Sequence, residues 1–281
     1  MNIINENNIN NYCTYLANEE RAPATIEKYT RSIRAFASWA GRAGITEITK
    51  DAAVGYKRRI SEIYGASSVN AAIAALNSFF RFMDWDVRLK PLKIQRQIFR
   101  AAEKELTRIE YERLLGAARK SEKRIYFILQ TICSTGIRVS ELSYIILEAV
   151  RRGRAVITNK GKTRIVFLPE KLQAALLQYA KERGITAGCI FITRSGRPVD
   201  RRDVWASMKK LCPAAGVPEE KAYPHNLRRL FAREFYGRHK DVVRLADVLG
   251  HASVNTTRIY TMESGAEHRR LVDGLGLAVG W

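Results

Sequence analysis

The sequence predicts a mainly α-helical protein with two domains and one small β-hairpin. Apolar residues recur at helical spacing along most of the chain, which is typical of amphipathic helices. A basic stretch around Pro91 breaks this pattern and indicates a boundary between domains. A pair of short strand-like segments within 155–168 flanks a turn. We therefore expect a helical domain at 1–86, a basic linker at 87–105 and a mixed α/β domain at 106–281.

The charge of the chain indicates its class of partner. The 281 residues carry a formal net charge of +20, while a hydrophobic fraction of 46% is normal for a globular protein. Such an excess of like charge opposes a compact fold, and a polyanionic partner relieves it. Nucleic acid is the leading candidate, because cations that bind its phosphates release counterions. A generically basic surface of the ribosomal kind is the alternative that composition leaves open.

Cysteine spacing and hydropathy favour the cytoplasm, where DNA would be. No CxxC pair is present, which predicts reduced thiols in a cytoplasmic protein, at Cys13, Cys133, Cys189 and Cys212. No apolar run approaches the roughly 18 residues of a membrane span. The first residues lack a basic segment followed by an apolar core, so we expect no secretory signal.

Four short helices are expected in residues 1–86. Pro23 is suited to the first turn of one helix, and Thr49 to the cap of another. Ser67 or Ser68 is the expected cap of the fourth. The apolar and aromatic residues follow helical spacing, which is far more typical of a core than of a base-stacking surface. The function of this domain should therefore lie on its polar face.

Basic residues cluster on that polar face and in the linker. A solvated charged face is the ordinary interpretation of any one of them. As a set they are typical of phosphate contacts, which position a protein on DNA without reading its sequence. The expected DNA contacts are Lys28, Arg31, Arg34, Lys57, Arg58 and Arg81 in the helical domain, and Arg88, Lys90, Lys93 and Arg96 in the linker.

The second domain begins with a strong helix signal. Thr107 and Glu110 have the spacing of a capping box, and a second helix is expected to end at Thr135 and Gly136. A hairpin should follow, with strands at 155–158 and 163–168 around a turn at 159–162. A helix at 170–183, a loop or small hairpin at 195–196 and further helices complete the expected fold.

The candidate chemistry lies in two segments of this domain. His225 and Arg228 are three residues apart and therefore share one face of a helix. Gly250 and His251 follow, and Tyr260 lies nine residues after His251. Far upstream, the segment TGIRVSEL holds Arg138 and Glu141. A nucleophile, cations and imidazoles in one basic protein indicate phosphate chemistry.

These motifs, in this order and spacing, resemble those of the tyrosine recombinase (phage-integrase, Xer-like) family. The similarity extends over nearly the whole chain. It implies a helical N-terminal core-binding (SAM-like) domain that clamps DNA and a mixed α/β catalytic domain. It also implies site-specific cleavage and rejoining of double-stranded DNA through a 3′-phosphotyrosine and a Holliday junction. Two protomers would bind each site, and four would form the synapse.

The resemblance assigns Tyr260 as the nucleophile and Arg138 and Arg228 as phosphate ligands. Most tyrosines are structural, and a phenol with a pKa of about 10 is a weak nucleophile unless nearby groups activate it. Two guanidiniums can hold the non-bridging oxygens of the phosphate with paired hydrogen bonds, which a lysine cannot reproduce. The ordinary alternative for these arginines is a salt bridge with Glu141 or Glu234.

The remaining assignments concern proton transfer. The family carries a lysine on a β-hairpin that protonates the leaving 5′-oxygen, and Lys160 matches it best, with Lys162 as the alternative or as a DNA contact. His225 would exchange a proton with Tyr260, and His251 would donate to the scissile phosphate. Glu141 would support Arg138 and His225 by accepting their hydrogen bonds.

No cofactor is expected, neither a metal nor a nucleotide. A two-metal mechanism needs converging carboxylates, and the motif region offers cations instead. The cysteines and histidines lack zinc-ligand spacing, and there is no glycine-rich GKS/T loop for ATP.

Two other classes of function stay open at the level of sequence. A nicking topoisomerase would use the same phosphotyrosine without a defined site. An architectural DNA-binding protein would bind through phosphate contacts alone. The length of the chain favours a Xer-like or small mobile-element enzyme. The DNA site, the biological role, cleavage in cis or in trans, and exchange of the apolar tail at 275–281 between protomers are left open.

Overall fold

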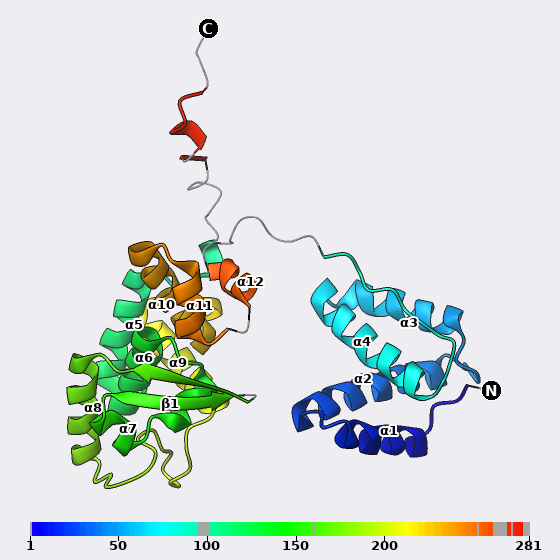
Figure 1. The fold of residues 1–281 in the computed structure, drawn as a ribbon, viewed down its shortest axis with the longest axis horizontal. Helices are drawn as coiled ribbons and strands as arrows, with labels where there is room; N and C mark the ends of the chain where they lie inside the picture. The colour runs from blue at the N-terminus through cyan, green and yellow to red at the C-terminus, as the bar shows by residue number, and fades with distance from the viewer. Residues whose placement is uncertain are drawn as a thin grey trace. The chain divides into compact units, whose positions relative to one another are not determined.

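The computed structural model of the chain divides into two compact units, residues 1–96 and 97–281 (Figure 1). The structure describes residues 2–94, 102–159, 161–251, 253–260, 269–270 and 272–277. Lys160 and Arg96 lie outside the described residues, as does the end of the apolar tail, and the side chain of Lys162 is not described.

The first unit packs its described helices around an aromatic core. These helices, blue to cyan in Figure 1, are α1 (Glu6–Asn18), α2 (Pro23–Arg42), α3 (Lys50–Ile63) and α4 (Ala66–Phe82). Tyr12, Phe36, Phe79 and Phe80 are each fully buried, and Phe79 meets Tyr12 edge to face with ring centroids 5.3 Å apart. The helically spaced aromatics therefore form a core, as the sequence predicts.

Three predictions for this unit concern the residues at helix N-termini. Pro23 is the first residue of α2, and the Thr49 hydroxyl accepts a hydrogen bond from the Ala52 amide at 3.2 Å at the start of α3. The prediction of Ser67 or Ser68 as the cap of α4 is wrong. That helix begins at Ala66, and its N-cap is Gly65 in an extended conformation without a side-chain hydrogen bond. Because a glycine is also tolerated at an N-cap, the nearby serines did not decide the boundary.

Two asparagines of α4 hold the segment that follows the helix. The amide side chain of Asn77 both donates to the carbonyl of Leu89 and accepts from its N–H, each at 2.8 Å. Asn70 binds Leu92 in the same way. Val87 and Leu89 are buried in the core of this unit. The first residues of the predicted linker therefore pack against α4.

The second unit surrounds a larger apolar core. The Thr107 capping box is present, because the Thr107 hydroxyl accepts from the Glu110 amide and the Glu110 carboxylate accepts from the Thr107 amide. Core residues include Leu114, Leu129 and Leu176, all fully buried. The described α-helices are α5 (Arg108–Ser121), α6 (Lys123–Thr135), α7 (Leu147–Arg151), α8 (Glu170–Glu182), α9 (Arg201–Ala215), α10 (Pro224–His239), α11 (Val242–Leu249) and α12 (Val254–Thr257). Short 3-10 helices lie at η1 (Ala102–Lys104), η2 (Val139–Tyr144), η3 (Glu219–Lys221) and η4 (Arg258–Tyr260).

The predicted hairpin is present as β1 (Arg154–Asn159) and β2 (Lys162–Phe167), paired antiparallel (Figure 1). Pairing continues to Asn159 and Lys162, so the turn is shorter than expected. Ile157 and Val166 face the core, whereas Phe167 is 70% exposed. Because side chains alternate along a strand, this hairpin has one buried and one exposed face.

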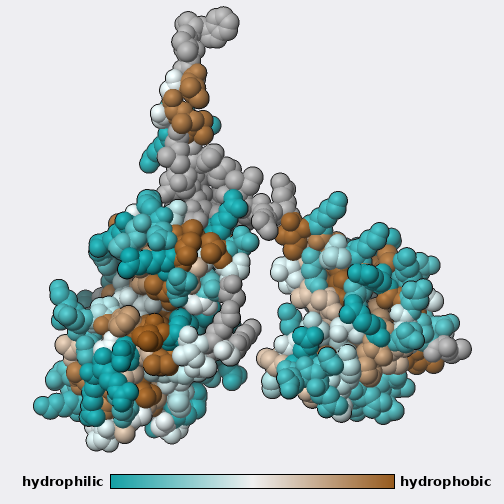
Figure 2. Space-filling model, viewed as in Figure 1, coloured by the Kyte–Doolittle hydropathy of each residue, from teal (hydrophilic) through white to brown (hydrophobic). Residues whose placement is uncertain are grey.

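The surface fits a protein with many charged residues. Teal, hydrophilic residues prevail on the visible face of each unit, with hydrophobic residues between them (Figure 2). No helix in the described part of the chain is long and apolar enough to cross a membrane.

Candidate active site

Arg138 is placed by a sharp change of direction after α6. This helix ends at Gly136, whose φ of +67° is a left-handed conformation that favours glycine. A Cβ at Gly136 would also overlap the ring of Phe231. The chain then turns into η2, where the Glu141 carboxylate accepts hydrogen bonds from the Arg138 amide at 2.7 Å and from its Nη1 at 2.9 Å. The Arg138 guanidinium is thereby held with part of its surface accessible to a ligand.

Arg228 is brought to the same place from α10. Its side chain donates to the carbonyl oxygens of Gly136 and Leu249, and only 2% of the residue is exposed. Burial and the nearby charge of Arg138 lower the pKa of Arg228 to about 10, so it stays a cation at neutral pH. A buried guanidinium with fixed hydrogen bonds is a preorganised charge for an anionic ligand.

His251 follows the end of α11 and is held by two hydrogen bonds. Gly250, with φ of +64°, caps the helix and redirects the chain. Arg228 Nη2 lies 3.1 Å from His251 Nε2, and Nδ1 lies 2.7 Å from the Thr257 hydroxyl. Because arginine only donates, Nε2 accepts and Nδ1 carries the proton. Burial and the charges of Arg228 and other arginines lower the pKa of His251 to about 4.

Tyr260 lies beside both histidines. It belongs to η4 and is 6% exposed. Its ring stacks on His251, with centroids 5.8 Å apart and planes inclined by 20°, and lies 6.2 Å from the ring of His225. The phenol packs in a small core with Leu245 and Leu249, so its position is set by the chain's own helices.

His225 sits in a concentration of positive charge. Burial lowers its pKa to about 4, together with the guanidiniums of Arg229, Arg228 and Arg201. The residue nevertheless keeps an exposed edge. A neutral imidazole at the surface of a cationic site can accept a proton, as a general base must.

The structure adds Arg164 to this site, which the sequence reasoning missed. We expected the Glu141 carboxylate to accept hydrogen bonds from Arg138 and His225. It accepts them from Arg138, and its second partner is Arg164 and not His225. Hydrogen bonds from Arg164 and Arg138 overcome the effect of burial and lower the pKa of Glu141 to about 2. The signal that could have found Arg164 is strand alternation, since it pairs with the buried Ile157.

The expected DNA contacts of the first unit lie on its surface. Arg31 pairs with Glu27, and Arg34 pairs with Glu6 through two hydrogen bonds. Lys57 donates to the carbonyl of Lys90 at 2.7 Å. The other exposed members are Lys28, Arg58, Arg81, Arg88, Lys90 and Lys93.

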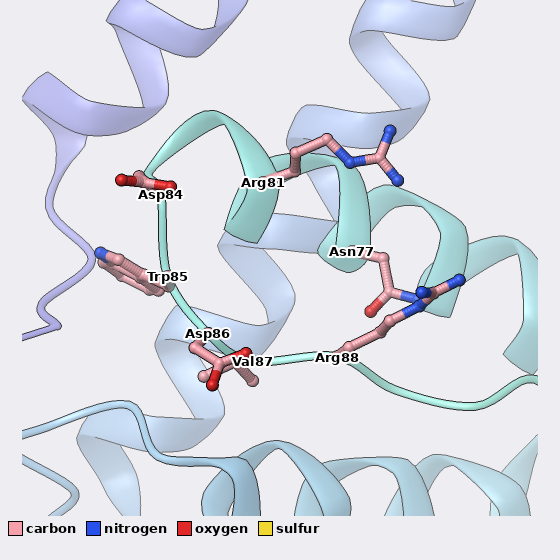
Figure 3. A pocket seen from close by; sticks show the side chains of 7 residues that line it. All are labelled: Asn77, Arg81, Asp84, Trp85, Asp86, Val87 and Arg88. Atoms are coloured by element: carbon pink, nitrogen blue, oxygen red, sulfur yellow. The ribbon is translucent and has the colours of Figure 1, made fainter.

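Two of these contacts share a pocket at the end of α4. Arg81 and Arg88 both line it, together with Asp84 and Asp86 (Figure 3). The two aspartates offset the positive charge at this point of the surface.

The site combines two arginines, two imidazoles and a buried tyrosine, and it follows a separate helical unit. This arrangement is that of a tyrosine recombinase, an enzyme that catalyses DNA cleavage and strand exchange. Residues 104–267 match the phage integrase family, and residues 9–86 match the phage integrase N-terminal SAM-like domain. The chain belongs to the phage integrase family.

Relatives and solved structures agree with this membership. Tyrosine recombinase XerA of Thermococcus kodakarensis is 31% identical, over 93% of this chain and 92% of the relative. Tyrosine recombinase XerD of Xanthomonas axonopodis pv. citri is 30% identical, over 88% and 90%. A crystal structure of XerA recombinase is similar with a TM-score of 0.54 at 25% identity, covering 98% of this chain and 99% of that one. A lambda integrase dimer bound to a COC′ core site has the same fold, with a TM-score of 0.73 at 18% identity, covering 93% and 96%.

Proposed function

We propose that Tyr260 is the nucleophile of this recombinase. Its phenol oxygen attacks a phosphorus of the DNA backbone, a P–O bond to tyrosine forms, and the bond to the 5′-oxygen breaks. The 5′-oxygen leaves with a proton, and a 3′-phosphotyrosine remains. A 5′-hydroxyl reverses the step, so rejoining needs no ATP. The observation that carries this proposal is the buried Tyr260 ring, which lies next to the imidazoles of both His251 and His225.

Arg138 and Arg228 stabilise the charge of the transition state in this mechanism. A guanidinium has five N–H donors, and Arg228 uses three of them in its hydrogen bonds with the described residues. Two donors are left for the non-bridging oxygens of a phosphate. The partly exposed guanidinium of Arg138 supplies further N–H donors. Both guanidiniums are fixed in place before the substrate binds.

Proton transfer falls to the histidines and a lysine. His225 takes the proton of Tyr260, and Lys160, with Lys162 as the alternative, protonates the leaving oxygen. In the absence of DNA, His251 Nε2 accepts from Arg228 and cannot donate to a phosphate. A bound phosphate would accept from Arg228 instead, and its charge would favour a proton on Nε2.

The first unit and the linker serve as the DNA clamp. Its exposed lysines and arginines contact phosphates, together with basic residues of the linker that leads to the catalytic domain at 106–281. Two protomers bind one recombination site and four form the synapse. This proposal is supported by the neighbours of the same fold, which include a lambda integrase dimer bound to a core site and a tetramer bound to a Holliday junction.

Covalent trapping tests this function. The protein is incubated with nicked duplexes from the DNA flanking its gene, then digested, and the peptide that contains Tyr260 is examined for a phosphonucleotide. We expect an adduct that Tyr260→Phe abolishes while DNA binding persists. An adduct on any duplex, formed equally by a monomer, would indicate a nicking topoisomerase. Salt-sensitive binding without an adduct on any duplex would indicate an architectural protein and overturn the proposal.

A further inference from the structure

Arg164 forms a bidentate ion pair with Glu141 in the catalytic unit. Its Nη1 and Nη2 donate to the two oxygens of Glu141 at 2.9 and 2.8 Å, the paired geometry that guanidinium and carboxylate favour. Glu141 is 1% exposed, and the side chain of Arg164 is 14% exposed. The same carboxylate holds Arg138. Arg164 therefore fixes the group that orients a proposed phosphate ligand.

The other side of Arg164 contacts the turn that carries His251. A Cβ at Gly250 would lie 2.7 Å from Arg164 Cδ and 2.9 Å from its Nη1, so the arginine lies directly against the Gly250 backbone. Gly250 connects Leu249, whose carbonyl accepts from Arg228, to His251. Only a residue without a side chain leaves space for this contact.

Arg164 and Arg228 thus connect the same two segments. Arg228 joins the carbonyl of Gly136 to that of Leu249, and Arg164 joins Glu141 to Gly250. One segment carries Arg138 and the other carries His251. The two arginines differ in access, because Arg228 contacts His251 whereas Arg164 reaches the site through Glu141.

The position of Arg164 is unusual for a strand. Its neighbours on the inner face of the hairpin are the buried Ala155, Ile157 and Val166. Its Nε–H is buried and has no hydrogen-bond partner among the described residues. An apolar residue would avoid this cost, so an arginine at this position points to a role in the site.

We propose that Arg164 is a positioning residue of the recombination reaction, which holds Glu141 and the Gly250 turn so that Arg138 and His251 meet one phosphate together. The proposal rests on the proposed function, because it assumes that these two groups bind the scissile phosphate. Arg164 itself makes no contact with DNA. Its loss therefore slows cleavage without weakening binding.

The alternative is that Arg164 only neutralises a buried carboxylate. A lysine would keep the positive charge but not the paired hydrogen bonds or the flat contact with Gly250. Arg164→Lys therefore separates positioning from charge neutralisation. Arg154, on the same hairpin but exposed, offers a matched control as Arg154→Lys.

The test compares wild type, Arg164→Lys, Arg164→Met and Arg154→Lys as full chains on one nicked duplex. The dissociation constant and the first-order rate of adduct formation at saturating enzyme are measured in the same buffer, with thermal unfolding as a check on folding. We expect both Arg164 variants to bind like wild type and to cleave at least about tenfold more slowly, the usual cost of losing an orienting partner. Arg154→Lys should match wild type in both quantities.

Each other outcome overturns the proposal. A wild-type rate in Arg164→Lys would leave Arg164 only a charge-neutralising role. Binding that weakens as much as cleavage slows would make it a DNA contact, and loss of cooperative unfolding in both Arg164 variants would make it purely structural. If wild type forms no adduct on any duplex, the proposed function itself fails. If wild type forms the adduct and the Arg164 variants form it equally fast, only the role of Arg164 fails.

Discussion

The imidazole of His251 stacks on the phenol of Tyr260 of the same chain, with ring centroids 5.8 Å apart and planes inclined by 20°. The phenol is 6% exposed and packs with Leu245 and Leu249. The tyrosine therefore lies in the site formed by its own chain. This placement predicts cleavage in cis.

A mixture of two inactive variants tests cleavage in cis. If each tyrosine acts in its own chain, Tyr260→Phe mixed with Arg138→Ala forms no adduct, because no single chain holds both groups. If the tyrosine acts in a neighbour's site, the mixture restores a complete site and an adduct appears. The measurement is adduct formation on a nicked duplex, and mixtures of each variant with wild type show that the subunits still assemble. An adduct from the two variants together would contradict the prediction.

Arg228→Lys should abolish efficient cleavage and also lower stability. Arg228 is 2% exposed and holds two carbonyl oxygens, which a single ammonium cannot reach in the same geometry. The loss of one such charged hydrogen bond costs about 2 kcal/mol in the free energy of unfolding. We expect the cleavage rate to fall about 100-fold or more, as when a fixed donor to a transition state is removed. Arg238→Lys, on the exposed end of the same helix, should change neither denaturant unfolding nor rate.

Acidification should destabilise the DNA-free protein over a pH range that is determined by the pKa values of two histidines. The pKa of His225 and of His251 is about 4, below the ordinary value of 6.5. Between these values the unfolded state binds more protons than the folded state, so the free energy of unfolding falls as the pH falls from about 6.5 to about 4. Glu141, with a pKa of about 2, adds its own loss of stability only below about 4.5.

Thermal unfolding at pH 7.5 and pH 5 measures this effect. The variant with both His225→Gln and His251→Gln should lose less stability than wild type between the two pH values, because a glutamine takes up no proton. Equal losses in the two proteins would show that other groups cause the pH dependence.

Gly136→Ala should be more damaging than the same change at Gly184. Both glycines adopt positive φ, +67° and +64°, so both substitutions carry a similar backbone strain of about 1 kcal/mol. At Gly136 the new Cβ would also overlap Phe231, whereas at Gly184 it meets no atom within 4 Å. Overpacking adds about 1 to 3 kcal/mol to the loss in the free energy of unfolding. Denaturant unfolding of the two variants measures the difference, and equal losses would contradict this account of Gly136.

Sequence patterns found the local parts of this site, and the family resemblance joined Arg138 to them, but the contacts of Arg164 were missed. His225 and Arg228 share a helix turn, and Gly250, His251 and Tyr260 lie within eleven residues, so spacing alone groups them. The contact of Arg164 with Glu141 joins residues 23 positions apart. It depends on how the hairpin packs against η2, which no local pattern encodes. Strand alternation indicates only that Arg164 faces inward.

The same distinction holds for the fold. The Thr107 capping box and the Gly136 helix end rest on short-range geometry, and both were predicted. The packing of Val87 and Leu89 into the first unit was not, since it depends on the Asn70 and Asn77 side chains reaching forward to the backbone. Those hydrogen bonds span 22 and 12 residues, beyond any helical or strand period.

Salt dependence tests the role of the first unit as a DNA clamp. Arg58 is exposed on α3, and if it contacts a phosphate, Arg58→Gln removes one neutralised charge. The slope of log K against log salt concentration should then decrease in magnitude by about 0.9, with similar weakening on every DNA sequence. Arg34 should behave differently, because it already pairs with Glu6 and contributes less net charge to the surface. Glu6→Gln should therefore strengthen binding and steepen the slope. Unchanged slopes in Arg58→Gln and Glu6→Gln would place the DNA away from both residues.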